Sequence, residues 1–456
     1  MATLAAFSGR GDIQGRCMAD EAAFRDHGGH GLARALGPWG LGAGVFNTVV
    51  GAGIFVLPAT LAREVGAAAP LVYLACAVAM GGVALCFAAA GSRVPTSGGP
   101  AGYVQAAFGP LAGFVIGVLV WLGAVLAAAG ITAAIADSLA RVLPSIGHGA
   151  GRNAFIVALL GMFAVVNIAG ATPGVRLVGV MTGAKLIPLL VLLAVGAAHL
   201  HFGHPISAIG HSPSAGFGRA MILALFAFQG METALSLSGE VRRPERNVPL
   251  GLLGAMGLVT TLYIAIQIVA QGVLGPALAR SSAPLADAAG SISPVLGQLL
   301  LVGAAISMLG YLASDALSAP RLLYTFARQG LLPRGLGAVS GTTRAPYPAI
   351  LLHAGLAALL ALSGSFAELA TLSSLTTVVV YMAGCLAAVM LQRRQVALAG
   401  PPLKLKGLIV AAAIGIAGMV WIAIHASVWE ALGLVGTLAA SIGWYAAARR
   451  LKVRAA

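Results

Sequence analysis

Apolar residues follow one another along this chain in long runs, which short groups of glycine, proline and charged residues interrupt. An α-helix needs about 20 apolar residues to cross the hydrocarbon core of a membrane. The runs are of that kind, and the interruptions between them predict twelve helices. Their predicted ranges are 38–65, 68–90, 104–141, 153–170, 175–198, 217–240, 249–275, 293–327, 347–364, 367–391, 407–426 and 429–448.

The composition supports a membrane protein. Hydrophobic residues make up 59% of the 456 positions and charged residues only 9%, whereas about a quarter of a typical soluble domain is charged. So few charges cannot cover a water-exposed surface, and the sequence therefore predicts an all-α polytopic membrane protein. Residues 1–36 are mixed polar and apolar and lack the compact apolar core of a secretory signal. We expect them to form a flexible cytoplasmic tail.

The 27 lysine and arginine residues are distributed unevenly over the predicted loops. With the N-terminus in the cytoplasm, most of them fall on the cytoplasmic side, which is the bias that orients helical membrane proteins. We therefore expect both termini to lie in the cytoplasm. The net charge of +14 is scattered over many short loops, which favours contact with anionic lipids over nucleic-acid binding.

Two of the predicted helices carry an interruption. The stretch "VVGAGIFVLPA" holds Gly51 and Gly53 inside the first apolar run, where each glycine costs about 1 kcal/mol relative to alanine. The stretch "FAFQGMETALSLSGE" holds Gly230 five helices later. Matched breaks in two oppositely oriented halves are typical of the midplane site of a secondary transporter. For a single Gly-x-Gly, close packing of two helices is the alternative.

A break of this kind offers two sorts of backbone group to a ligand. Freed N–H groups at a half-helix N-terminus suit a carboxylate, and freed carbonyls suit an ammonium group. A zwitterionic amino acid carries both, so the two breaks predict an amino acid site.

Five motifs resemble those of the amino acid–polyamine–organocation transporter superfamily, in the same order along the chain. They are "GAGIFVLPA", "PTSGGPAGYVQAAFGPLAGFVIGVLVWL", "FAFQGMETA", "GEVRRPERNVP" and "RLLYTFARQGLLP". The resemblance implies a LeuT-like five-plus-five inverted repeat with twelve transmembrane helices, in which helices one and six are broken at mid-membrane. It places the ten-helix core at 37–391, and two peripheral helices with a basic cytoplasmic C-terminus at 392–456.

The resemblance also implies a set of substrate-binding residues. The first break would bind the α-carboxylate through backbone N–H groups, and the second would receive the α-ammonium on backbone carbonyls. Phe226 lies where relatives carry an aromatic gate, although ordinary helix packing is the alternative for Phe226 and Phe228. The implied substrate-binding residues are Val50, Gly51, Ala52, Gly53, Phe226, Ala227, Phe228 and Gly230.

Lys185, in "MTGAKLIPLL", is an ionisable residue in the middle of an apolar run. Such a lysine costs at least about 2.5 kcal/mol on insertion, so it normally faces a partner or a cavity. It resembles a helix-five lysine of sodium-independent relatives, whose ammonium stands where sodium-coupled relatives hold an ion. A coupling role with protons and a structural tether to helix-one carbonyls both remain open, and both predict that sodium is not needed.

Two carboxylates complete the predicted coupling and gating residues. Glu232 follows the second break, where many relatives have a glutamate, and either gates the site or supports helix packing. Asp315, in "GYLASDALSAP", departs from the family pattern. Three interpretations of Asp315 stay open: a pair with Lys185, contact with a cationic substrate side chain, or a structural role.

We find no sequence pattern of a hydrolase, an intramembrane protease or an ATP-driven pump, and we expect no enzyme activity and no cofactor. The histidines of one predicted external loop match no standard metal site; they are His199, His201, His204 and His211. The sequence therefore predicts a sodium-independent amino acid transporter, coupled to protons or working by exchange, for which an oligomer is not required. A polyamine permease and a non-transporting amino acid sensor are the alternatives.

Overall fold

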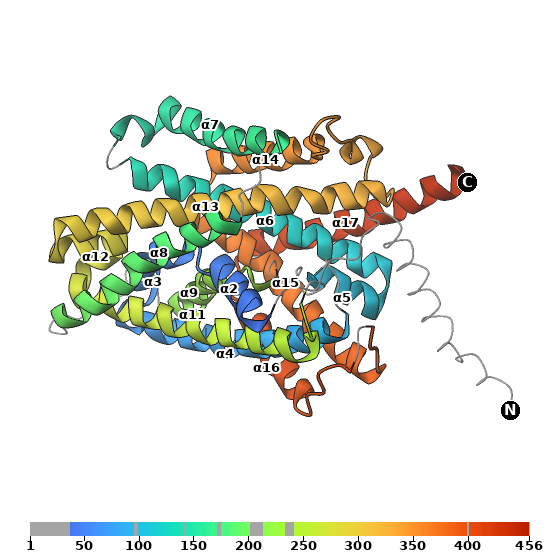
Figure 1. The fold of residues 1–456 in the computed structure, drawn as a ribbon, viewed down its shortest axis with the longest axis horizontal. Helices are drawn as coiled ribbons and strands as arrows, with labels where there is room; N and C mark the ends of the chain where they lie inside the picture. The colour runs from blue at the N-terminus through green and yellow to red at the C-terminus, as the bar shows by residue number, and fades with distance from the viewer. Residues whose placement is uncertain are drawn as a thin grey trace.

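The computed structural model describes residues 37–94, 99–140, 143–170, 175–200, 213–232, 241–398 and 401–455. Helices joined by short turns form the architecture of this part of the chain (Figure 1). In chain order they are α2 (Pro38–Val49), α3 (Gly53–Val65), α4 (Ala69–Arg93), α5 (Gly99–Phe108), α6 (Pro110–Leu139), α7 (Gly149–Ile168), α8 (Val175–Gly196), α9 (Pro213–Phe228), α11 (Pro244–Leu274), α12 (Pro284–Ile292), α13 (Pro294–Arg328), α14 (Tyr347–Ser363), α15 (Phe366–Arg393), α16 (Leu408–Ala423) and α17 (Val428–Ala455).

Each predicted apolar range contains a helix, but several bounds differ from the prediction. The range 38–65 is divided into α2 and α3, as its glycines led us to expect. The range 104–141 is also divided, because Gly109 has a φ of +94° and Pro110 then starts a new helix. Proline is well suited to the first turn of a helix, where its missing N–H is not needed. The short helix α12 has no counterpart among the predicted ranges.

The helices identify a polytopic membrane protein. Within the described residues, 7 helical stretches are long and apolar enough to cross a membrane, and further apolar helices are shorter. Large apolar side chains are exposed on several of the helices; Val157 on α7, Leu359 on α14 and Val410 on α16 are each more than half exposed. A lipid environment is the natural cover for such side chains.

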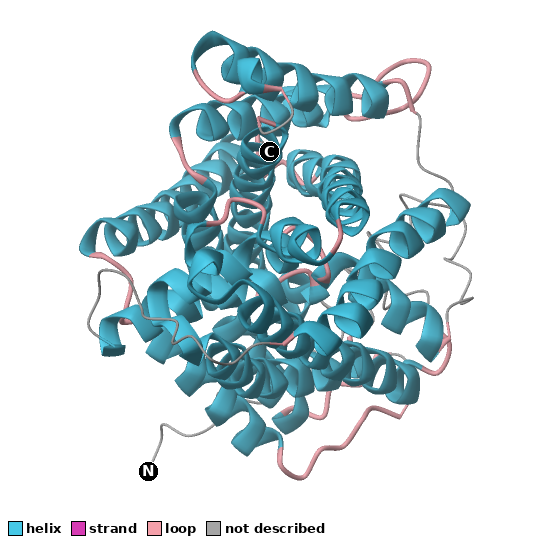
Figure 2. Ribbon diagram, turned by 90° about the vertical axis from the view of Figure 1, so that its left-hand side faces the viewer, coloured by secondary structure: helices cyan, strands magenta, loops and turns pink. Residues whose placement is uncertain are grey.

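The longest helices run roughly along one direction, and the others cover their sides (Figures 1 and 2). Helices α7 and α14 lie side by side along one edge, and α16 lies against α4 on another. Small residues permit the second contact, since a Cβ added to Gly82 of α4 would come within 2.5 Å of the Ala411 carbonyl oxygen of α16. Close approach through small residues is a common means of helix association in membranes.

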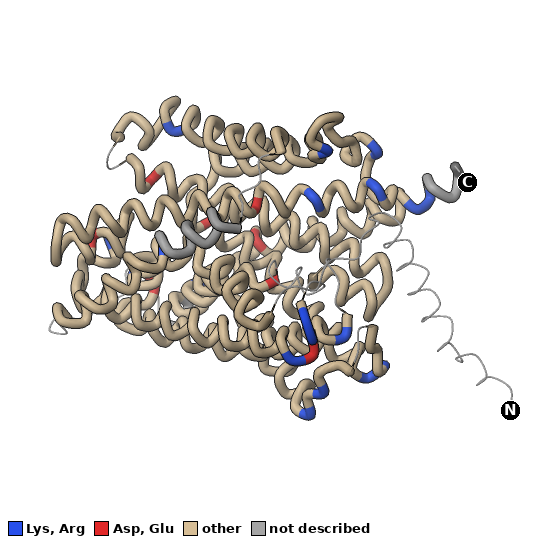
Figure 3. Tube along the Cα trace, in the orientation of Figure 1, with Lys and Arg blue, Asp and Glu red and all other residues tan. Residues whose placement is uncertain are grey.

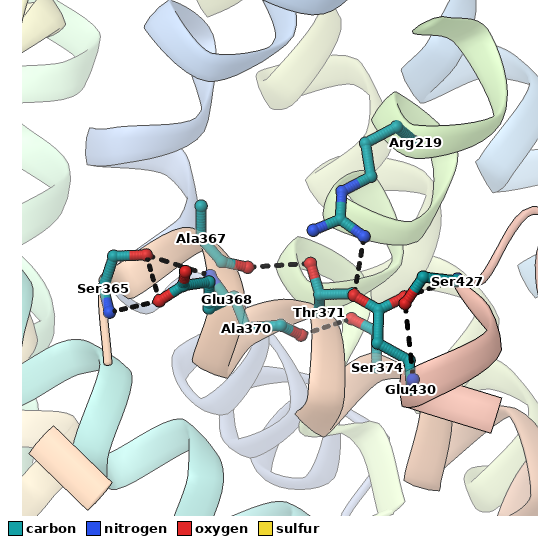
Figure 4. A network of polar contacts seen from close by, with 9 residues as sticks. All are labelled: Arg219, Ser365, Ala367, Glu368, Ala370, Thr371, Ser374, Ser427 and Glu430. Carbon is teal, nitrogen blue, oxygen red and sulfur yellow. Dashed lines mark hydrogen bonds and ion pairs between the residues drawn. The ribbon is translucent and has the colours of Figure 1, made fainter. Parts of the chain in front are cut away.

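Basic residues are concentrated at one end of this assembly. Figure 3 shows most lysine and arginine residues at the end toward which the C-terminal helix α17 runs, with few at the opposite end. Ser365 caps α15: its hydroxyl accepts from the Glu368 N–H, and the Glu368 carboxylate accepts from the Ser365 N–H (Figure 4). Ser427 and Glu430 form the same exchange at α17, and Arg219 of α9 donates to Glu430 at 2.8 Å.

Arg93, the last residue of α4, is only 1% exposed, although the sequence places it in a cytoplasmic loop. Its guanidinium donates to the carbonyl oxygens of Val396 at 3.1 Å and Leu403 at 3.3 Å, and to the Gln392 side chain at 3.3 Å. The Arg93 carbonyl in turn accepts from the Leu398 N–H at 2.9 Å. Arg93 therefore attaches the segment between α15 and α16 to the end of α4.

We expect Arg93→Met to destabilise the protein, because methionine keeps the apolar stem but removes the donors to the partly buried acceptors of Val396, Leu403 and Gln392. A hydrogen bond to a charged group contributes about 1.5–3 kcal/mol. Thermal unfolding of the purified protein in detergent measures the effect. Arg450→Met, at an exposed position of α17, is the matched control. Equal unfolding midpoints for the two variants would contradict this role of Arg93.

Candidate functional site

The first helix break lies at the predicted glycines. Helix α2 ends at Val49 and α3 begins at Gly53, so Val50, Gly51 and Ala52 lie between the two helices, with Ala52 as the N-cap of α3. The Gly51 N–H turns back to donate to the Val49 carbonyl at 2.8 Å. No described side chain caps the start of α3. The Phe55 N–H donates to the Ala52 carbonyl at 3.0 Å, and the N–H groups that precede it at the start of α3 remain available to a ligand, as at other uncapped helix N-termini.

The second break follows α9. The helix ends at Phe228, Gln229 and Gly230 form a turn, and residues 231–232 are helical again. Gly230 has a φ of +111°, a conformation that costs glycine little and other residues much more. Residues 233–240, which complete the predicted range, lie outside the described part of the chain.

The two breaks pack against each other through their glycines. A Cβ added to Gly53 would come within 2.9 Å of the Ala227 Cα, and one added to Gly230 would come within 2.9 Å of the Thr48 carbonyl oxygen. Each break therefore uses a glycine to admit the backbone of the other. Close packing was the alternative interpretation of the Gly-x-Gly pattern, and it applies to Gly53. It does not apply to Gly51, whose added Cβ would come no closer than 3.7 Å to any neighbouring atom, an ordinary contact distance.

Lys185 of α8 points its ammonium at the end of α2. Its Nζ donates to the carbonyl oxygens of Asn47 and Val50, both at 2.7 Å, and the residue is only 4% exposed. The tether to helix-one carbonyls that the sequence left open is therefore present. A positive charge at the C-terminal end of a helix is also electrostatically favourable.

Two further helices supply donors to the same break. The Tyr263 hydroxyl of α11 lies 2.8 Å from the Val49 carbonyl oxygen and 2.9 Å from the Ala227 carbonyl oxygen, and so bridges the two breaks. The Ser307 hydroxyl of α13 donates to the Gly51 carbonyl at 3.3 Å. Neither Tyr263 nor Ser307 could be recognised in the sequence, because the role of each depends on which helices lie beside the break.

Glu232 binds across the second break. Its carboxylate accepts from the Gly230 N–H at 3.0 Å and from the Tyr381 hydroxyl of α15 at 2.6 Å. The carboxylate thus stabilises the turn at Gly230 and joins it to α15. A second connection to α15 runs through Gln229, whose side-chain amide bonds the hydroxyls of Ser373 and Ser374 at 3.1 and 3.2 Å.

The two phenylalanines of α9 have different surroundings. Phe228 is fully buried, with its ring centroid 5.4 Å from that of Tyr263 and 6.3 Å from that of Tyr73. This aromatic cluster is the packing environment that the sequence left as an alternative to ligand contact. Phe226 packs edge-on against Phe366 at the start of α15, with a centroid distance of 5.5 Å.

Asp315 lies apart from the other predicted residues. Its Oδ2 is 2.8 Å from Nε2 of His353 on α14, and both side chains are buried. The proposed pair of Asp315 with Lys185 is therefore wrong, because the lysine is bonded to backbone carbonyls instead. His353 was not among the predicted residues. Its position inside the apolar run 347–364 could have indicated a buried partner, since ionisable residues are rare in such runs.

The first break contacts α9 through Gly53 and Ala227, and Lys185 of α8 bonds the end of α2. Of the histidines in the predicted external loop, His199 is described, and its Nδ1 donates to the Val195 carbonyl at 2.9 Å. His201, His204 and His211 lie outside the described residues.

Comparison with known proteins adds independent findings. A family model described as amino acid permease matches residues 36–447. The chain is 28% identical to the serine/threonine exchanger SteT of Bacillus subtilis, over 77% of this chain and 81% of that protein. It is 26% identical to the branched-chain amino acid permease BcaP of Bacillus subtilis, over 80% and 82%. It is also 28% identical to the vacuolar cationic amino acid transporter 2 of Arabidopsis thaliana, over 80% of this chain but 61% of that longer protein.

We expect Gly53→Ala to destabilise the protein and Gly51→Ala to leave its stability near that of the wild type. The added methyl group at Gly53 would overlap the α9 backbone, which cannot move without disturbing both breaks, and such overpacking costs about 1–3 kcal/mol. The methyl group at Gly51 has room. Thermal unfolding of the two variants checks the difference, and equal midpoints would refute the packing argument.

Proposed function

This chain belongs to the amino acid permease family, and from that premise we propose that it moves amino acids across the cytoplasmic membrane by alternating access. Transport is independent of sodium and is either coupled to protons or an exchange of one amino acid for another. Residues 37–391 form a ten-helix inverted-repeat core, and residues 392–456 add two peripheral helices and a basic C-terminus. The tail expected at residues 1–36 lies outside the described residues. The membrane helices number twelve in this proposal.

The crossing of the two broken helices carries the proposal. An uncapped half-helix start and a set of backbone carbonyls lie next to each other there, and they are the two kinds of group that a zwitterion requires. The absence of a side chain at Gly51 supports close approach of a carboxylate to the backbone of the break, where the N–H groups of Ala52 and Gly53 would bind it; the Gly51 N–H already donates to the Val49 carbonyl. The α-ammonium then binds carbonyls of residues 226–228, and Phe226 closes over the substrate.

Lys185 supports independence from sodium. Its ammonium already donates hydrogen bonds to the carbonyl oxygens of Asn47 and Val50, both at 2.7 Å. These carbonyls are the kind of oxygen ligands that would otherwise bind a metal cation. A proton that leaves Lys185 would release these carbonyls, so the same side chain can couple the break to protons. Glu232, bonded to Gly230 and Tyr381, is placed to transmit movement of the second break to α15.

In the alternating-access cycle, one group of helices rocks against another. The first group is helix one (α2 and α3), helix two (α4), helix six (which begins with α9) and helix seven (α11). The second group is helix three (α6), helix four (α7), helix eight (α13) and helix nine (α14). The concentration of basic residues at one end of the assembly supports an orientation with that end, and both termini, in the cytoplasm. The engagement of Asp315 with His353 disfavours the polyamine permease, because the carboxylate already has a partner. Counterflow distinguishes a transporter from a sensor on the same scaffold.

We expect saturable counterflow of an amino acid in proteoliposomes that contain no sodium. Vesicles preloaded in turn with neutral, cationic and acidic amino acids and with polyamines are diluted into trace labelled substrate. Exchange with one amino acid class establishes the function and the substrate group. Exchange with polyamines alone, or no exchange by protein that is verified as folded, would overturn it.

Lys185→Ala should abolish the stimulation of uptake by an imposed pH gradient while substrate still binds, because it removes the exchangeable proton while Tyr263 and Ser307 still donate to carbonyls of the first break. Uptake under an imposed pH gradient, together with equilibrium binding of labelled substrate, measures the two effects separately. Lys406→Ala, at an exposed position before α16, serves as the control. An unchanged stimulation in Lys185→Ala would assign the lysine a tethering role alone.

A further inference from the structure

The pair formed by Asp315 and His353 joins α13 to α14 at a distance from the helix breaks. The two residues are 8% and 3% exposed, and their bond measures 2.8 Å. A small cavity lies beside the pair, and its other walls are apolar side chains of α6, α7, α13 and α14, among them Ala128, Leu160 and Phe163. Nδ1 of His353 is buried and has no hydrogen-bond partner among the described residues.

The charge of this pair depends on a single proton. An ionised carboxylate only accepts hydrogen bonds, so Nε2 of His353 carries the hydrogen that Asp315 accepts, and Nδ1 of a neutral ring is left as an acceptor. With a neutral ring the pair has a charge of −1, which is costly among apolar side chains. A proton that binds Nδ1 converts the ring to imidazolium and makes the pair neutral overall. Lys185 does not neutralise Asp315, because it is bonded to α2 carbonyls.

We propose that the Asp315–His353 pair is a proton-binding site whose occupancy sets the rate of exchange. The ligand is a single proton, which enters from the cavity side onto Nδ1 of His353 and leaves by the same atom. No covalent or redox step is involved. The binding site stands on the geometry of the pair, and its effect on exchange rests on the proposed transport function.

Tyr311 connects this pair to the first break. It lies one helical turn from Asp315 on α13, on the same face, and its ring is 3.7 Å from the position of a Cβ on Gly51. A change in the charge of the pair therefore acts on a side chain that touches the break.

Few other titratable groups face the pair. The cavity walls from α6, α7 and α14 contribute apolar residues besides His353 itself. The charged residues Asp137 of α6 and Arg152 of α7 bond to each other at 3.5 Å, near the helix ends. Along α13 the other titratable residues are Tyr311, Arg321, Tyr324 and Arg328, and α14 adds Tyr347. Lys185 lies on the neighbouring α8, where it is bonded to α2 carbonyls.

The double variant Asp315→Asn/His353→Gln tests the proton-binding step. Asparagine and glutamine keep a hydrogen bond between the two helices but cannot bind a proton, so this variant is better protected against misfolding than either single substitution. In a difference titration of purified protein between about pH 5 and 8, where histidines change charge, it should bind about one proton fewer per chain than the wild type. His148→Gln, at an exposed histidine before α7, calibrates the loss of one proton. Equal titrations of the wild type and the double variant would overturn the proposal.

The pH profile of counterflow tests the effect on exchange. The counterflow rates of the wild type and His148→Gln should depend on pH in the same way. The double variant keeps Lys185 but should lose the pH dependence of the rate in the interval where the difference titration shows that its proton is missing. Identical profiles for the wild type and the double variant would overturn the proposal even if a proton is lost. A wild type without counterflow at any pH would refute transport itself, and in that case the titration alone decides whether the pair binds a proton.

Discussion

The organisation of this protein depends on one requirement: carbonyl groups that a helix break releases inside a membrane must find donors within the protein. Lipid supplies none, and each unpaired group costs several kcal/mol. At the end of α2, Lys185 donates to Asn47 and Val50, Tyr263 to Val49, and Ser307 to Gly51. The donors come from α8, α11 and α13, so three separate helices are held around the break by the same need.

The glycines of the two breaks allow this arrangement to be compact. Gly53 admits the backbone of α9 and Gly230 admits the backbone of α2, which brings the Ala227 carbonyl close enough to Val49 for Tyr263 to reach both. The turn at Gly230 is stabilised in its own right by Glu232 and, through Gln229, by α15. The breaks are therefore a shared structure of two helices, and neither would have the same surroundings without the other.

The sequence predicted those features that arise from local chemistry. Gly51, Gly53 and Gly230 weaken their own helices, and Lys185 is costly in an apolar run wherever its neighbours lie, so each could be recognised from the chain alone. The bond between Asp315 and His353 could not, because it joins two helices at positions 38 residues apart, and nothing local to Asp315 distinguishes His353 from Lys185 as its partner. The same reason applies to Tyr263, Ser307 and Arg93, because the role of each depends on the helices and segments that lie next to it in the fold. The division at Gly109 had a local signal in the Gly-Pro pair, but continuous hydrophobicity obscured it.

The contacts at the first break differ in what an alternating-access cycle would demand of them. Tyr263 belongs to helix seven of the proposed repeat and would move with the breaks, so its bonds to Val49 and Ala227 can persist. Ser307 belongs to helix eight, on the other side of the moving boundary, and its 3.3 Å bond to Gly51 is the longest of the set. The Asp315–His353 pair and its cavity lie among helices three, four, eight and nine, all on that other side. A proton bound there need not move with the breaks to influence them, since Tyr311 on the same helix already lies beside Gly51. In this proposal the substrate therefore binds to the helices that move, and the proton that sets the exchange rate binds to the helices against which they move.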